Sequence, residues 1–218
     1  MKIYSIPADL KTIIFDIDGT LYTNQLYVFE QVDAQIRHFA HTTGISENIA
    51  RKKIQSYRSA WSREHDGKKI SLGNAFKAFG ISIEESIRWR NELLSPEIYL
   101  KKDERLIASL LELKKSYKLI CLTNNPVTAA RKTLKAIGVD TIITDIVGLD
   151  TCMKSKPAME NMEKVREITG TDYSQCISIG DRYDIDLSLP LELGCGAILV
   201  DGAEDIYDLD KILINCRI

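Results

Sequence analysis

The second half of the chain alternates between two patterns of hydrophobic positions. Short continuous apolar runs, typical of buried parallel strands, are separated by segments with an apolar residue every three or four positions, which indicate helices. The expected strands lie at 117–122, 141–146, 175–179 and 197–200, and the expected helices at 103–116, 127–137, 158–169, 186–193 and 206–214. This alternation predicts an α/β fold with a doubly wound parallel sheet and helices on both faces.

The first half follows a different pattern. A strand expected at 12–17 is followed by a region that is helical throughout, with helices expected at 27–42, 46–65, 71–79 and 82–94. The chain therefore divides into a Rossmann-like core at 1–22 and 100–218 and an all-helical insertion at 23–99. An insertion after the carboxyl end of a strand stands over the ligand crevice of an α/β sheet and can act as a lid. An independent helical module is the alternative.

Composition narrows the class of protein. The chain has 218 residues, of which 44% are hydrophobic and 28% charged, as is typical of a soluble globular enzyme. Its formal net charge of −2 gives no reason to expect nucleic acid or an anionic membrane as a partner. No apolar run reaches membrane-spanning length and the first residues lack a signal-peptide core, so we expect a cytoplasmic protein.

Two carboxylates follow the first expected strand. Asp16 stands at the strand end, and Asp18 comes two residues later, before Gly19 and Thr20. Since glycine permits a sharp turn, both acids can face one point, where they repel unless a cation lies between them or one is protonated. This arrangement favours metal-assisted nucleophilic chemistry. An ordinary turn, with Asp18 or Thr20 capping a helix, is the alternative.

Two later strand ends carry groups that suit an anion. Thr123, Asn124 and Asn125 offer a hydroxyl, two carboxamides and backbone amides to phosphate oxygens, ahead of a helix N-terminus. Capping of that helix is the alternative. Further on, Lys156 precedes Pro157, and its ammonium group could neutralise a phosphoryl group or a carboxylate. A solvated loop lysine is the alternative there.

The strand expected at 175–179 ends in an acidic segment. After Gly180 come Asp181, Asp184 and Asp186, three carboxylates within six residues. Such a set suits a hard divalent cation, and Mg²⁺ ordinarily takes one or two direct carboxylates together with water. Because Asp186 also suits a helix cap and Asp184 a solvated position, the sequence leaves open which of the two supports a metal.

In chain order, these segments read Asp-x-Asp-Gly-Thr, Thr-Asn, Lys-Pro and Gly-Asp-x-x-x-x-Asp. In type and order they resemble the four motifs of the haloacid dehalogenase-like (HAD) superfamily, which uses an aspartate nucleophile and Mg²⁺. The motifs cover the whole α/β portion, and the helical insertion occupies the place of that family's C1 cap. The resemblance therefore implies a HAD-like hydrolase with a Rossmann-like core and a helical cap.

The resemblance also implies a role for each matching residue. Asp16 attacks phosphorus and forms an aspartyl-phosphate, while Asp18 protonates the leaving oxygen and later takes a proton from water. The implied phosphate-binding residues are Gly19, Thr123, Asn124 and Lys156. The implied Mg²⁺ ligands are Asp16, Asp18 through its main-chain carbonyl, Asp181, and Asp186 directly or through water.

The expected activity is Mg²⁺-dependent hydrolysis of a small soluble phosphomonoester, of the phosphoglycolate, sugar phosphate or nucleoside monophosphate type. Members similar to the dehalogenases proper lack the second aspartate, so Asp18 favours phosphoester chemistry over carbon–halogen cleavage. A sugar phosphate mutase of the β-phosphoglucomutase type and a non-catalytic HAD-like binding protein are the alternatives. The candidate substrate contacts are Tyr22, Asn24, Arg58 and Trp61. The sequence does not indicate an oligomeric state.

Overall fold

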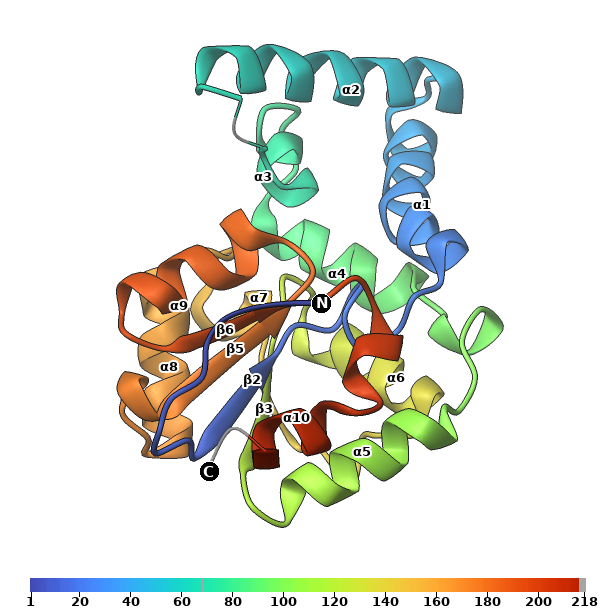
Figure 1. Cartoon of the computed structure of the whole chain (residues 1–218). Coiled ribbons are helices and arrows are strands. Elements are labelled where there is room, and N and C mark those ends of the chain that lie inside the picture. The colour runs from blue at the N-terminus through green and yellow to red at the C-terminus, as the bar shows by residue number, and fades with distance from the viewer. Residues whose placement is uncertain (68, 216–218) are drawn as a thin grey trace. The chain divides into compact units, whose positions relative to one another are not determined.

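The computed structural model describes residues 1–67 and 69–215 and contains two compact units (Figure 1). Met1–Gln25 and Pro96–Ile218 form an α/β unit, and Leu26–Ser95 form a helical unit. None of the helices in the described part of the chain has both the length and the apolar character needed to cross a membrane.

Six strands in the described residues form one sheet, in the order β1-β6-β5-β2-β3-β4. Their bounds are Lys2–Ser5 (β1), Thr12–Phe15 (β2), Lys118–Leu122 (β3), Asp145–Val147 (β4), Cys176–Gly180 (β5) and Gly196–Leu199 (β6). β2 pairs in parallel with β3 on one side and β5 on the other, and β1 runs antiparallel to β6 at the edge. All four residues of β2 are buried, so this strand is the centre of the fold.

Helices cover both faces of the sheet (Figure 1). They are α5 (Glu104–Lys114), α6 (Val127–Ile137), α7 (Leu149–Cys152), α8 (Met159–Thr169), α9 (Ser188–Glu192) and α10 (Leu209–Asn215). Met162 and Val165 of α8 pack with Ile14 and Ile120 of the central strands in one buried cluster. On the other face, α5 packs against β3 and α10. Burying each large aliphatic side chain stabilises the folded state by about 1.5–3 kcal/mol. Because helices cover both faces of the sheet, its strands appear in the sequence as continuous apolar runs.

Two strands differ from the sequence prediction. β1 was not predicted, because its four residues are all exposed and no apolar run marks it; it pairs with β6 as an edge strand. The strand expected at 141–146 was placed too early. Ile142 and Ile143 are buried, but their amides donate to the carbonyl of Val139 in a turn, and strand pairing begins only at Asp145.

Two helix starts also differ. The helix expected from residue 186 begins at Ser188, because Tyr183–Leu187 form a separate π-helical turn. The last helix, expected from 206, begins at Leu209 after a 3₁₀ turn over Ala203–Ile206. Apolar periodicity does not distinguish these tighter or wider turns from the α-helix that follows them.

The helical unit has its own hydrophobic core. Its helices are α1 (Gln25–Thr43), α2 (Glu47–Glu64), α3 (Leu72–Lys77) and α4 (Ile83–Leu93). Phe39 of α1, Phe76 of α3 and Trp89 of α4 are almost completely buried in one cluster. Ser82 caps α4 by accepting a hydrogen bond from the Glu85 amide at 3.1 Å.

A buried carboxylate ties α1 to α2. Asp33 on α1 is only 4% exposed, and its two oxygens accept hydrogen bonds from Arg51 Nε at 2.7 Å and Nη2 at 2.9 Å. Arg37, one turn further along α1, donates to the same carboxylate. Hydrogen bonds from Arg51, together with those from Arg37, hold the pKa of Asp33 below its ordinary value although burial opposes this.

Replacing Asp33 by Asn should lower the free energy of unfolding at pH 7 by about 2 kcal/mol, because it removes charge-assisted hydrogen bonds from a buried position. The pKa of Asp33 is lower in the folded than in the unfolded chain. Ionised Asp33 therefore contributes to stability at every pH above its unfolded-state pKa, and this contribution is lost as the pH falls through its folded-state pKa. Denaturant unfolding followed by circular dichroism should therefore show that the difference in unfolding free energy between the parent chain and Asp33→Asn narrows below about pH 4.

Asp172→Asn is the matched control for this measurement. Asp172 pairs with Arg166 at 3.0 Å, but both side chains are more than half exposed. Exposed pairs contribute little, so this variant should change stability by less than about 1 kcal/mol. An Asp33→Asn protein as stable as its parent at pH 7 would contradict the role assigned to the buried pair.

Candidate active site

The loops after β2, β3 and β5 meet at one edge of the sheet. These strands are parallel neighbours, and their register places Phe15 beside both Cys121 and Ile179. The Asp16 amide continues the ladder by donating to the Ile179 carbonyl at 2.9 Å. Residues that directly follow the three strands therefore lie side by side, where open α/β sheets bind ligands.

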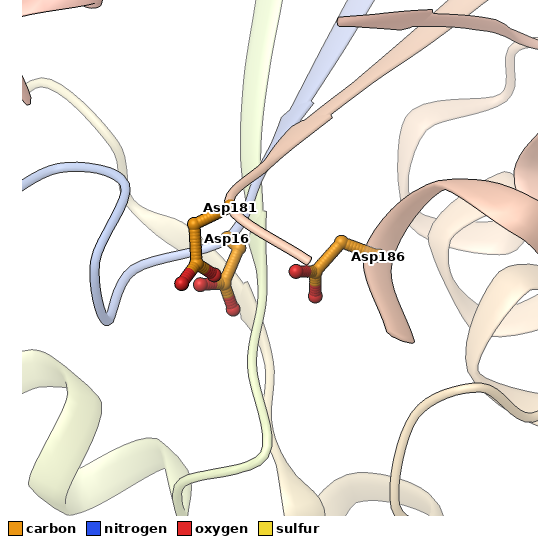
Figure 2. A group of neighbouring side chains, drawn as sticks. All are labelled: Asp16, Asp181 and Asp186. Atoms are coloured by element: carbon orange, nitrogen blue, oxygen red, sulfur yellow. The ribbon is translucent and has the colours of Figure 1, made fainter. Parts of the chain in front are cut away.

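Three carboxylates gather at this edge (Figure 2). One oxygen each from Asp16, Asp181 and Asp186 lie within 4.8 Å of one another. Figure 2 shows the carboxyl groups of Asp16 and Asp181 pointing to the same side, with that of Asp186 directed towards them from the neighbouring turn. Asp184 is exposed and stands outside the cluster, so of the two candidates that the sequence left open, the fold brings Asp186 to the other acids.

The ammonium group of Lys156 is buried among these acids. It donates to Asp16 Oδ1, to Asp186 Oδ1 at 2.7 Å and to the Leu122 carbonyl at 2.8 Å. An ammonium group has three N–H donors, and these three acceptors match them. The Lys156 backbone amide donates to Asn124 Oδ1 at 2.6 Å, which joins the loop after β3 to the lysine. Lys156 thus connects three of the motifs that the sequence singled out.

Two glycines let the loops approach closely. Gly19 has a φ of +88°, and a Cβ there would lie 2.7 Å from Asp181 Oδ2. A Cβ on Gly180 would lie 2.4 Å from the Cβ of Asp186. Since such contacts are too short for any side chain, the acid cluster depends on glycine at both positions.

The electrostatics of the cluster follow from its burial. Burial raises the pKa of Asp16 to about 7; Lys156 acts in the opposite direction, and Asp186 adds to the rise. Burial alone would lower the pKa of Lys156, but Asp16 and Asp186 outweigh it and raise that pKa above its ordinary value. The lysine therefore stays charged, and the carboxylates around it repel one another.

In the cluster, Asp181 has a carboxylate oxygen that is available to bind a cation. Burial raises its pKa, opposed by the nearby Arg182. Its buried Oδ1 lies 3.4 Å from Arg182 Nε but accepts no hydrogen bond from the residues that the structure describes. An orphaned carboxylate oxygen beside two more carboxylates is a donor set that fits a hard divalent cation such as Mg²⁺.

Asp18 lies beside the cluster and is held by two neighbours. Tyr22 Oη donates to its Oδ1 at 2.6 Å, and Asn125 Nδ2 donates to its Oδ2 at 2.8 Å. The sequence names Tyr22 as a candidate substrate contact, and in this structure its hydroxyl contacts Asp18. The sequence placed the Asn125 carboxamide among the groups that suit an anion, but it did not predict the contact with Asp18, because side-chain direction in a loop cannot be read from the sequence.

The other expected site residues of the α/β unit have definite positions. Thr123 is 2% exposed, and its Oγ1 accepts a hydrogen bond from the Asn125 amide at 3.1 Å. Asn24 Nδ2 donates to the Tyr99 carbonyl at 2.8 Å. Thr123 therefore belongs to the same loop as the Asp18 contact, whereas Asn24 anchors the chain segment around Tyr99.

Arg58 and Trp61 belong to the helical unit. Arg58 lines a groove of about 620 Å³ within that unit, together with Phe29 of α1. Arg58 Nε donates to the Ile70 carbonyl at 3.2 Å, and burial lowers the pKa of its guanidinium group. Trp61 stacks on His65 with ring centroids 3.8 Å apart. Both side chains thus have structural contacts inside the helical unit.

Solved structures share this fold over nearly the whole chain. A HAD phosphatase from Thermococcus onnurineus is 22% identical with a TM-score of 0.64, and a predicted phosphoglycolate phosphatase from Haemophilus somnus 129pt is 19% identical with a TM-score of 0.61. The protein YfnB from Bacillus subtilis, bound to magnesium, is 17% identical with a TM-score of 0.60. Each comparison covers 94% of this chain and 98% of the other.

A sequence model of the haloacid dehalogenase-like hydrolase family matches residues 10–190. The match begins before β2, the strand that Asp16 follows, and ends beyond Asp186, and so contains all four motifs. The resemblance in the sequence and the expected fold class, a Rossmann-like core with a helical cap, are confirmed. The chain belongs to the haloacid dehalogenase-like hydrolases.

Proposed function

We propose that this hydrolase is a Mg²⁺-dependent phosphatase that acts on a small soluble phosphomonoester through an aspartyl-phosphate on Asp16. The observation that supports it most is the buried Asp16 carboxylate at the end of the central strand, in contact with Lys156 and within 4.8 Å of two further carboxylates. A nucleophilic carboxylate, the ammonium group of Lys156 and carboxylates that can bind a metal ion lie together here, as phosphoryl transfer requires.

Asp16 acts as the nucleophile. Its backbone is fixed by the ladder bond to Ile179, and Lys156 orients its Oδ1. Attack on phosphorus by this carboxylate replaces one difficult displacement by two easier ones, with the phosphoryl group held on Asp16 in between. Lys156, which stays charged, stabilises the negative charge that the phosphoryl group brings next to the buried acids.

Asp18 acts as the proton carrier. It protonates the leaving oxygen in the first step and takes a proton from the attacking water in the second. Thr123 and Lys156, with backbone amides near Gly19 and Asn124, hold the phosphate oxygens. The Asn124 side chain already accepts from Lys156, so we assign its contribution to the backbone.

The metal ligands are Asp16, Asp181 and the main-chain carbonyl of Asp18, with Asp186 as a direct or water-mediated ligand. Mg²⁺ bound there supplies positive charge that neutralises the carboxylates and polarises the phosphoryl group. The buried Oδ1 of Asp181, which accepts no hydrogen bond from the described residues, supports this assignment, and so does the magnesium bound to YfnB.

The helical insertion at 23–99 serves as the cap and carries the substrate contacts, Arg58 and Trp61 among them. Phosphoglycolate, sugar phosphates and nucleoside monophosphates are the classes to be tested. Product analysis with a sugar phosphate separates a phosphatase, which releases inorganic phosphate, from a mutase, which forms an isomer.

Asp16→Asn should reduce phosphate release from every active substrate by at least about 1000-fold, because the amide cannot form the phosphoryl intermediate. A panel of phosphomonoesters, assayed with Mg²⁺ and with EDTA, provides the measurement. Asp145→Asn, at an exposed position at the start of β4, should leave the rate unchanged. An active, folded Asp16→Asn protein would disprove the mechanism.

Asp181→Asn should raise the dissociation constant for Mg²⁺ by at least about tenfold, since it removes a charged oxygen ligand. Calorimetric titration of the chain with Mg²⁺, and with Mn²⁺ followed by electron paramagnetic resonance, measures this without substrate. Asp184→Asn is the matched control, because Asp184 is exposed and outside the cluster. Equal affinities in the two variants would contradict the assigned ligand set.

A further inference from the structure

Asp18 has a hydrogen-bond donor on each of its two carboxylate oxygens. Tyr22 Oη donates to Oδ1 at 2.6 Å, and Asn125 Nδ2 donates to Oδ2 at 2.8 Å. One donor comes from the turn after β2 and the other from the loop after β3, so the carboxylate is fixed from two directions. Two such contacts restrict rotation about the bonds that orient a carboxyl group far more than one contact does.

The turn after β2 brings Tyr22 to Asp18. The Leu21 amide donates to the Ile17 carbonyl at 3.0 Å, and the left-handed Gly19 lets the chain reverse within this short segment. Asp18 and Tyr22 consequently pair as an isolated parallel bridge. Because the Tyr22 side chain is only 4% exposed, burial holds its hydroxyl against Asp18.

The second donor is anchored just as firmly. The Asn125 amide donates to Thr123 Oγ1 at 3.1 Å, and the Asn125 carbonyl accepts from the Leu149 amide at 3.0 Å. The residue is 8% exposed. With its backbone held on both sides, Asn125 can present its carboxamide to Asp18 in a fixed direction.

We propose that Tyr22 and Asn125 are positioning residues that orient Asp18 for proton transfer; the inference rests on the proposed phosphatase function. In the first step, the bond from Asp16 to phosphorus forms, the bond from phosphorus to the leaving oxygen breaks, and protonated Asp18 gives its proton to that oxygen. In the second step, water attacks phosphorus, the bond to Asp16 breaks, and Asp18 takes the proton of the water.

The two donors keep their hydrogen bonds through both steps. A carboxyl oxygen has two lone pairs, so an oxygen that accepts from Tyr22 or Asn125 can also carry the transferred proton. A proton carrier that is held in place needs little reorganisation when the bond to the leaving oxygen breaks. The contribution of Tyr22 to the rate should therefore increase with the basicity of the leaving group.

The test compares Tyr22→Phe with the parent chain on aryl phosphates of differing leaving-group basicity, assayed with Mg²⁺. The ratio kcat/KM reports the step in which the leaving group departs. We expect it to fall about tenfold for phenyl phosphate and to stay within about twofold for 2,4-dinitrophenyl phosphate, whose leaving group needs no proton. In an Asp18→Asn background, Tyr22→Phe should have no further effect, because it acts through Asp18.

Tyr207→Phe is the matched control. Tyr207 Oη also donates to an aspartate, Asp103 Oδ2, at 2.6 Å in the same unit, but at the start of α5 and not at the site. It should leave kcat/KM unchanged across the series. Asn125→Ala should reproduce the dependence on the leaving group, and it provides the same test if Tyr22→Phe does not fold.

Four outcomes are distinguishable. A loss confined to the basic leaving groups supports the inference. An equal loss for all of them indicates a merely structural role and overturns it, as does the absence of any loss. A parent chain that is well folded but releases no phosphate from any ester would contradict the proposed function itself, and the inference with it.

Discussion

Like charges are packed closely at the carboxyl ends of β2 and β5, and this constraint governs the rest of the α/β unit. Asp16 and Asp186 are almost fully buried, and removing two carboxylates from water is unfavourable unless a cation and hydrogen bonds replace the solvent. Lys156 meets this requirement with its three donors, of which the third binds the Leu122 carbonyl. The lysine thereby ties three strand ends and their loops to one point.

The surrounding backbone is shaped to make this packing possible. Parallel pairing on both sides of β2 brings the loops together, and Gly19 and Gly180 let them approach to distances that no side chain would allow. The site therefore has little freedom to adjust. Substitutions at the two glycines would move the acids.

The helical unit is held together by different means. Its core of aromatic and aliphatic residues is its own, and Asp33 joins α1 to α2 through Arg51. Asp33 and Ser82 connect and cap helices in this unit, while Asp16, Lys156 and Asp186 of the α/β unit lie together at one strand edge. Under the function proposed above, the α/β unit would carry the chemistry and the inserted helices the contacts that select a substrate.

Much of the fold of this protein could be predicted from its sequence. The apolar runs predicted the parallel sheet, because a strand buried on both faces is apolar throughout, whichever helices pack against it. The helical periodicity predicted the insertion, and the acids after the strands indicated the family. Weak local signals failed. The exposed β1 exists only through its pairing with β6, and Ile142 and Ile143 are buried by a turn that an apolar run cannot distinguish from a strand.

At the site, the sequence determined which residue types are present and which strand ends carry them. Only the tertiary structure decided their partners: that Asp186 and not Asp184 joins the acid cluster, that Lys156 lies between Asp16 and Asp186, and that Tyr22 and Asn125 hold Asp18. The physical reason is that spacing along the chain fixes where a backbone segment ends, whereas the direction of a loop side chain depends on neighbours that are distant in sequence.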